Sequence, residues 1–130
     1  MDMEELFGEI ISVYTRAEAI DDGVLVDVTE IAKEAGFSIP VALTCGLWAE
    51  AVAWDEANGA TQDEKGRLWD ILMVLFFSIR TAKGNRCDGA VLRVPNKPGA
   101  TRATKLPFYA LCGPGDDAEP VLTVMLVGED

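Results

Sequence analysis

The segment TQDEKGRLWDILMVLFFSIRTAKG, residues 61–84, decides the fold class of the chain. Thr61 and Glu64 have the spacing of a capping box, in which two side chains satisfy free backbone N–H groups where a helix begins. Gly84 is typical of a helix end. Two apolar stripes recur between these ends at helical spacing: Leu68, Leu72, Leu75 and Ile79 in one, and Trp69, Met73 and Phe76 in the other. The segment therefore predicts one long central helix that is covered on most sides.

Three runs rich in β-branched and aromatic residues follow this helix, at residues 90–94, 105–112 and 121–127. A loop and a turn rich in Gly, Pro and Asp separate them, so we predict a three-stranded antiparallel β-meander. The last run, VLTVMLV, is apolar on both faces apart from Thr123. Such a strand is covered on both faces or pairs with a partner.

The sequence before the long helix consists of short alternating elements. Residues 9–14 predict a strand, and Thr15 with Glu18 predicts a capped helix that ends near Gly23. The next expected elements are a strand over residues 24–28, a helix over 30–35 capped by Thr29, an extended segment at 39–41 and a helix from Thr44 to about residue 56. We therefore expect a single α+β domain over residues 1–130, with a helical and mixed N-terminal half followed by the meander.

The composition excludes several classes of active site. The 130 residues include 22 acids, 11 bases and no histidine, which gives a net charge of −11. A Ser-His-Asp or Cys-His catalytic unit and a zinc site with histidine ligands are therefore excluded. The acidic pair Asp21–Asp22, with Asp27 nearby, matches no calcium loop and is ordinary turn sequence. We expect no metal, no cofactor and no direct binding of nucleic acid, because phosphates repel a net anion.

The N-terminus and the cysteines favour a cytoplasmic location without membrane contact. The sequence MDMEELFGEI is acidic where a secretory signal needs positive charge, and no apolar stretch has the length of a membrane span. The three cysteines form no CxxC pattern, which favours reduced thiols. We expect Cys45 and Cys112 in the core, while the bases beside Cys87 favour a lowered pKa of its thiol.

The charges are segregated along the chain. Residues 1–79 hold sixteen acids and four bases, residues 80–105 hold seven bases and one acid, and residues 106–130 hold five acids and no base. The basic segment either reaches for phosphate or an acidic partner, or forms ion pairs with acids of the same domain, and the second interpretation is favoured. The acidic half either keeps the protein soluble or imitates phosphates in the groove of a nucleic-acid-binding protein.

Three sets of residues are candidates for contact with a partner. The acidic face is predicted to comprise Asp21, Asp22, Glu30, Glu34, Asp55 and Glu56. A basic and aromatic set comprises Arg93, Lys97, Arg102, Lys105 and Tyr109. Tyr14 and Arg16 come where a strand meets a capped helix, which is a common place to present a side chain. We identify no catalytic residue in any set.

Three segments together resemble a family of small uncharacterised proteins encoded on bacterial plasmids and other mobile elements. They are YTRAEAIDDGVLVDVTEIAKEAGFSIPVALT (residues 14–44), QDEKGRLWDIL (62–72) and GPGDDAEPVLTVMLVGED (113–130). The resemblance implies a bacterial cytoplasm and a mobile-element setting, but no activity and no site residue. Small acidic proteins in that setting often resemble inhibitors of host defence, such as antirestriction and anti-CRISPR proteins.

The sequence leaves three functions open. The first is a non-catalytic module whose acidic face docks on a basic surface that otherwise holds nucleic acid. The second is an enzyme, because Tyr14, Thr15 and Arg16 are distantly similar to the start of ADP-ribosyltransferase-like domains, where early polar side chains hold NAD. The third is a homo-oligomeric structural subunit, a homodimer that pairs through residues 121–127. Salt dependence, calorimetry with NAD and sedimentation separate these functions.

Overall fold

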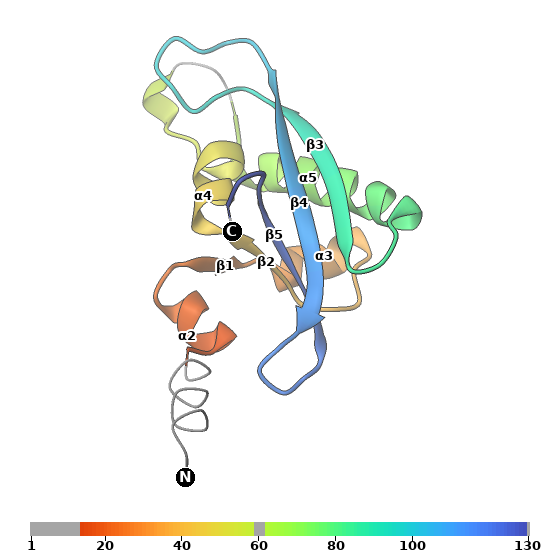
Figure 1. Ribbon diagram of the computed structural model, residues 1–130. Coiled ribbons are helices and arrows are strands. Elements are labelled where there is room, and N and C mark those ends of the chain that lie inside the picture. Colours follow the sequence, from red (N-terminus) through yellow and green to blue (C-terminus); the bar gives the residue numbers. More distant parts are fainter. Residues whose placement is uncertain (1–13, 59–61, 130) are drawn as a thin grey trace.

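The computed structural model describes residues 14–58 and 62–129, which form an α+β fold with one mixed sheet and one long helix (Figure 1). The strands are β1 (Leu25–Asp27), β2 (Val41–Thr44), β3 (Arg86–Arg93), β4 (Thr104–Pro114) and β5 (Pro120–Leu126). The helices are α2 (Arg16–Asp21), α3 (Thr29–Ala35), α4 (Cys45–Leu47) and α5 (Glu64–Ser78), with a π-helical turn at Trp48–Val52 and 3-10 turns at Glu56–Asn58 and Ile79–Thr81. The strand predicted over residues 9–14 lies outside the described residues, apart from Tyr14.

The sheet is larger than the sequence predicts. Its five strands lie in the order β1-β2-β5-β4-β3, with β2 parallel to β5 and the other neighbours antiparallel. The predicted three-stranded meander is therefore wrong as a description of the sheet, because β1 and β2 extend it beyond β5. Strand β2 was expected only as an extended segment, since its four residues show no alternation of polar and apolar side chains.

Strand β5 lies inside the sheet, which argues against edge-to-edge pairing of a second copy through residues 121–127. Leu122 is opposite Val41 of β2 on one side and opposite Cys112 of β4 on the other. Residues 122–124 are thus paired on both sides, and that stretch has no free edge for a second copy of the chain. The apolar character of the run follows from this central position.

The core lies between the sheet and two helices, α3 and α5, which cover one of its faces (Figure 1). Leu72 and Leu75 of α5 are fully buried with Phe108 of β4. The expectation that α5 is covered on most sides is confirmed for its middle, where residues 67–76 are buried or half-buried apart from Asp70. It is not confirmed at the C-terminal end, where Phe77 is 59% exposed and Ile79, in the 3-10 turn that follows α5, is 37% exposed.

The helix ends explain which capping predictions are confirmed. The hydroxyl of Thr15 accepts from the backbone N–H of Glu18 at the start of α2, and that of Thr44 accepts from the backbone N–H of Leu47 at the start of α4. Thr29 does not cap α3, since its hydroxyl donates to Asp27 instead. The helix cap of α5 is Asp63, and the predicted cap Thr61 lies outside the described residues. The helix from Thr44 ends with its π-helical turn at Val52, short of residue 56.

Candidate functional site

The turn between β4 and β5 holds the start of helix α2. The two carboxylate oxygens of Asp116 accept from the backbone N–H groups of Arg16 at 2.7 Å and of Ala17 at 3.0 Å. An acidic side chain is favourable there because the first N–H groups of a helix have no partner within the helix and carry partial positive charge. Two segments about a hundred residues apart in the sequence are thereby joined.

The guanidinium of Arg16 points to the sheet. It donates to the hydroxyl of Thr123 at 2.7 Å and to the backbone carbonyl of Leu122 at 2.8 Å. Burial lowers the pKa of Arg16, while the nearby carboxylates of Asp27 and Asp116 act in the opposite direction. Arg16 therefore joins α2 to β5. Its side chain, which was predicted to be presented to a partner, is used in these contacts within the chain. Its neighbour Tyr14 is 52% exposed, and the Tyr14 hydroxyl donates to Asp22 at 3.1 Å.

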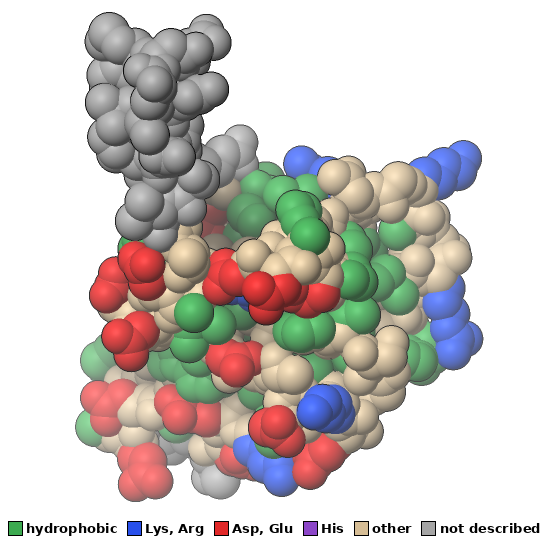
Figure 2. All heavy atoms as spheres, turned by 90° about the horizontal axis from the view of Figure 1, so that it is seen from below, with side chains coloured by type: hydrophobic (Ala, Val, Ile, Leu, Met, Phe, Trp, Pro, Cys, Tyr) green, Lys and Arg blue, Asp and Glu red, His purple; other side chains and the backbone are tan. Residues whose placement is uncertain are grey.

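A cleft of about 330 Å³ lies where α2, the start of α3 and the β4–β5 turn meet. Four carboxylates and the single guanidinium of Arg16 line it, so the charges along its wall leave a net negative balance. The carboxylates belong to Asp27, Glu30, Asp116 and Glu119. We call residues 16–22, 27–34 and 115–119 the acidic end. Seen from below, Asp and Glu side chains spread over this end, with Lys and Arg mainly at the margins (Figure 2).

The structure divides the predicted acidic face into two groups. Asp21 and Asp22 are exposed on α2 and the turn after it, and Glu30 and Glu34 are exposed on α3, so all four belong to the acidic end. The segment that holds Asp55 and Glu56 lies at the other end of the molecule, beside the β3–β4 loop (Figure 1). The backbone N–H of Asp55 donates to Asn96 of that loop at 2.9 Å.

Two acidic residues of the cleft, Asp116 and Glu119, were missed as site residues. The sequence GPGDDAEP, residues 113–120, is typical of a hairpin turn and was interpreted as one. A turn sequence carries no signal for the helix that packs against it. Only the fold shows that this turn meets α2 and Asp27.

The basic segment neutralises few acids. The described residues form three ion pairs, Lys33–Glu30 at 3.8 Å, Arg86–Asp88 at 3.0 Å and Arg93–Glu50 at 3.5 Å. Only the last joins the basic segment to an acid outside it. Three cations at or near the β3–β4 loop are exposed and have no ion pair within residues 14–58 and 62–129: Lys97, Arg102 and Lys105.

Tyr109 lies apart from these loop cations. It is 4% exposed, and the guanidinium of Arg86 lies 4.0 Å from the centre of its ring. Its hydroxyl donates to the backbone carbonyl of Glu129 at 3.0 Å. The aromatic residue of the predicted basic set thus faces the opposite surface of the sheet from α5, while Arg93 is held at the carbonyl and carboxylate of Glu50.

Two of the three cysteines differ from their predicted environments. Cys45, expected in the core, is exposed, whereas Cys87 is buried. Cys112, also expected in the core, is half-buried and packs against it. Burial raises the pKa of the Cys87 thiol and Asp88 raises it further, so the expected lowering is wrong. Residues 14–58 and 62–129 contain no group of three or more side chains arranged to hold a metal ion. None of the helices in this part of the chain combines the length and the apolar character of a membrane span.

Comparison with known proteins identifies a family without a described activity. A family profile, described as a family of unknown function, matches residues 3–130. The searches of curated proteins and of solved structures found no match. Since the profile covers nearly the whole sequence, the chain belongs to the family of unknown function DUF6573.

Proposed function

We propose that this protein is a non-catalytic binding module whose acidic end docks on a basic surface of a protein partner. The observation that carries the proposal is the cleft at which α2, α3 and the β4–β5 turn bring Asp27, Glu30, Asp116 and Glu119 together. These residues come from two separate parts of the sequence, residues 27–30 and 116–119. Their convergence concentrates negative charge at one end of a molecule whose net charge is −11.

The acidic end offers charge in a fixed arrangement. Asp116 is held by two backbone N–H groups, and the carboxylate of Asp27 accepts from the backbone N–H of Thr29 at 3.1 Å. Around them, acids on α2 and α3 extend into solvent, and Lys33 is their one ion-pair partner among the described residues. Fixed charges lose little conformational entropy on binding and steer a basic partner during its approach.

The chemistry of such a surface suits a groove that normally holds phosphates. Carboxylates accept hydrogen bonds from Arg and Lys as phosphate oxygens do, and they carry the same sign of charge. The resemblance to small proteins of plasmids and mobile elements extends the proposal to a nucleic-acid-binding protein of host defence in the bacterial cytoplasm. The protein then acts there as a counter-defence inhibitor of the antirestriction or anti-CRISPR kind.

The test compares two variants that remove the same number of exposed negative charges. Glu30→Gln with Asp117→Asn alters the acidic end, whereas Glu56→Gln with Asp70→Asn alters other surfaces. Immobilised wild-type protein is used to capture partners from a nuclease-treated bacterial lysate, and affinity for each captured protein is then measured. We expect binding to weaken about fivefold in the first variant, to remain unchanged in the second, and to fall steeply as salt rises.

Two further outcomes decide the proposal. Phosphate imitation predicts that an oligonucleotide competes with this protein for the captured partner. Equal weakening in both variants, or an affinity that salt does not change, would contradict docking through the acidic end.

A further inference from the structure

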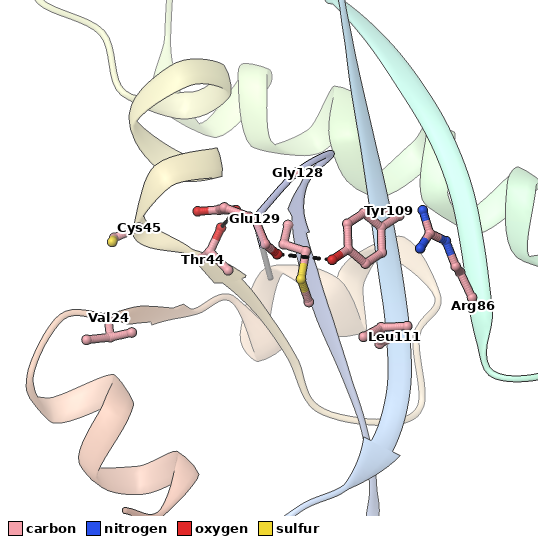
Figure 3. Close-up of a pocket in the computed structure, with 9 residues that line it drawn as sticks. Val24, Thr44, Cys45, Arg86, Tyr109, Leu111, Gly128 and Glu129 are labelled. Carbon is pink, nitrogen blue, oxygen red and sulfur yellow. Dashed lines mark hydrogen bonds between the residues drawn. The ribbon is translucent and has the colours of Figure 1, made fainter.

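A second cavity lies on the sheet face opposite α5. Its volume is about 840 Å³, and it shares no lining residue with the acidic cleft. Figure 3 shows the residues that line it. Small-molecule sites commonly have volumes of roughly 300–1,000 Å³ and apolar walls with a few polar groups. The cavity matches that description in both size and lining.

The floor of the cavity is apolar and held by the sheet. Tyr109 of β4 is directly opposite Met125 of β5, and Leu111 follows on the same face of β4. Val24, in the turn before β1, adds an apolar wall and is 47% exposed. Because β4 and β5 have neighbouring strands on both sides, this floor is formed before any ligand arrives.

Hydrogen bonds fix the side of the cavity near α4. The carboxylate of Glu129 accepts from the hydroxyl of Thr44 at 2.7 Å and from the backbone N–H of Leu126 at 2.8 Å. Tyr109 donates to the backbone carbonyl of Glu129 from the other side. Figure 3 shows the Glu129 carboxylate turned toward Thr44 and away from Arg86. The Glu129 carboxylate is the one negative charge among the described lining residues, and it is already hydrogen-bonded at the side of the cavity near α4.

Arg86 supplies the one positive charge among the same lining residues. Its guanidinium lies 4.0 Å from the centre of the Tyr109 ring, and it donates to the Asp88 carboxylate at 3.0 Å. These contacts orient the planar group at the rim, and its side chain stays 49% exposed. A guanidinium next to an apolar floor recognises an anionic group on an otherwise apolar molecule.

We propose that this cavity binds a small molecule with a flat apolar body and one anionic group. The apolar body lies over Leu111 and Met125, and the anionic group lies at Arg86. Such a preference runs against the overall negative charge of the protein, and the anionic group must compete with the Asp88 carboxylate for the Arg86 guanidinium. This site is independent of the acidic end, and either proposal survives the failure of the other.

The test uses the fluorescent anion anilinonaphthalene sulfonate and its uncharged analogue phenylnaphthylamine. We expect the anion to bind at one site, to raise the melting temperature of the folded protein, and to bind more tightly than the analogue. In Arg86→Gln we expect the affinity for the anion to fall about tenfold while the affinity for the analogue stays the same. In Arg86→Lys we expect part of the lost affinity for the anion to be retained. In Met125→Glu both probes lose their site.

A matched control and an independent readout complete the experiment. Leu92 lies on β3, the strand that holds Arg86, but its side chain is 67% exposed and does not line the cavity. We therefore expect Leu92→Gln to leave probe binding at the wild-type level. Cys45 lines the cavity and is exposed, so a saturating anion slows its alkylation by iodoacetamide in the wild type and not in Met125→Glu. Equal affinity for the two probes would overturn the proposal, as would a loss of anion binding in Leu92→Gln as large as in Arg86→Gln. An alkylation rate of Cys45 that the anion leaves unchanged would also overturn it. So would probe binding that falls as the protein concentration rises, because a second copy of the chain would then cover the cavity.

Discussion

Arg67 is the residue on which the packing around α5 most depends. It is 4% exposed, and its guanidinium donates to the backbone carbonyls of Val52 at 3.0 Å and of Val94 at 2.8 Å. The side chain also lies 5.0 Å from the centre of the Trp54 ring. Burial lowers the pKa of Arg67, and the nearby charge of Arg93 lowers it further. The planar guanidinium thus links the π-helical turn, α5 and the end of β3 through its Nε and Nη1 groups, while its buried Nη2 has no hydrogen-bond partner among the described residues.

Replacement of this guanidinium tests its contribution to stability. In Arg67→Lys the charge remains, but one ammonium cannot satisfy both carbonyls, so we expect a loss of about 2–4 kcal/mol in the free energy of unfolding. Urea denaturation measures the loss. Arg80→Lys is the control, because Arg80 is exposed over the Phe76 ring, and it costs under about 1 kcal/mol. A loss of similar size in the two variants would mean that Arg67 acts only as a charge.

The cysteines show why the surroundings of a residue were hard to predict from its neighbours in sequence. Arg86 and Cys87 are adjacent in β3, yet side chains of adjacent strand residues point to opposite faces. Arg86 reaches the open face, while Cys87 enters the core and gains a raised pKa. The positive charge of Arg86 therefore lies on the opposite face of the sheet from the Cys87 thiol, and it does not lower the pKa of that thiol.

Glycines at two helix ends allow backbone strain to be separated from packing at the scale of an element. Gly23 follows α2 with φ of 81°, and Gly36 ends α3 with φ of 110°. A Cβ at Gly23 would meet no atom within 4 Å, whereas one at Gly36 would lie 3.0 Å from the Phe76 ring. Both sites require the left-handed region that favours glycine, but only the second also requires space.

We therefore predict unequal costs for the same substitution. Gly23→Ala lowers the free energy of unfolding by about 1 kcal/mol through backbone strain alone. Gly36→Ala costs about 2 kcal/mol or more, because α3 must move away from α5 as well. Urea denaturation compares the two, and Gly36→Ala combined with Phe76→Leu measures how much of the excess comes from the ring. Equal costs at Gly23 and Gly36 would show that the ring yields without penalty.

The helices whose starts could be predicted are those with a capping side chain at the N-terminus. Thr15 and Thr44 predicted helix starts from the sequence alone, since a capping hydroxyl acts on an N–H group only a few residues away. Strand β2 was missed because its stability comes from β1 and β5, which are distant in sequence. The exposure of Phe77 at the end of α5 was missed because an apolar run shows that a helix can be buried, not where its neighbours stop covering it.

At the scale of the whole molecule, the sequence shows that charge is segregated but not where it gathers. Asp27 and Glu30 are close in sequence and line the same cleft. Asp116 and Glu119 join them because β4 and β5 turn back at that end of the sheet, whereas Asp55 and Glu56 are carried to the other end. The candidate site thus depended on topology, which the predicted three-stranded meander did not contain.

This distribution predicts how salt changes stability. Exposed acids at one end repel one another, so Asp21→Asn with Glu34→Gln raises the melting temperature by about 2–4 °C at low salt. Lys97→Gln with Arg102→Gln removes two cations of the β3–β4 loop that have no ion pair among the described residues, and it lowers the melting temperature. Calorimetry at about 20 mM and about 500 mM NaCl measures both shifts, and we expect them to shrink at high salt because the screening length falls to a few ångströms. A melting temperature that falls in the first variant at low salt would mean that Asp21 and Glu34 take part in local stabilising contacts, and that the negative charge of this end is balanced in the folded chain.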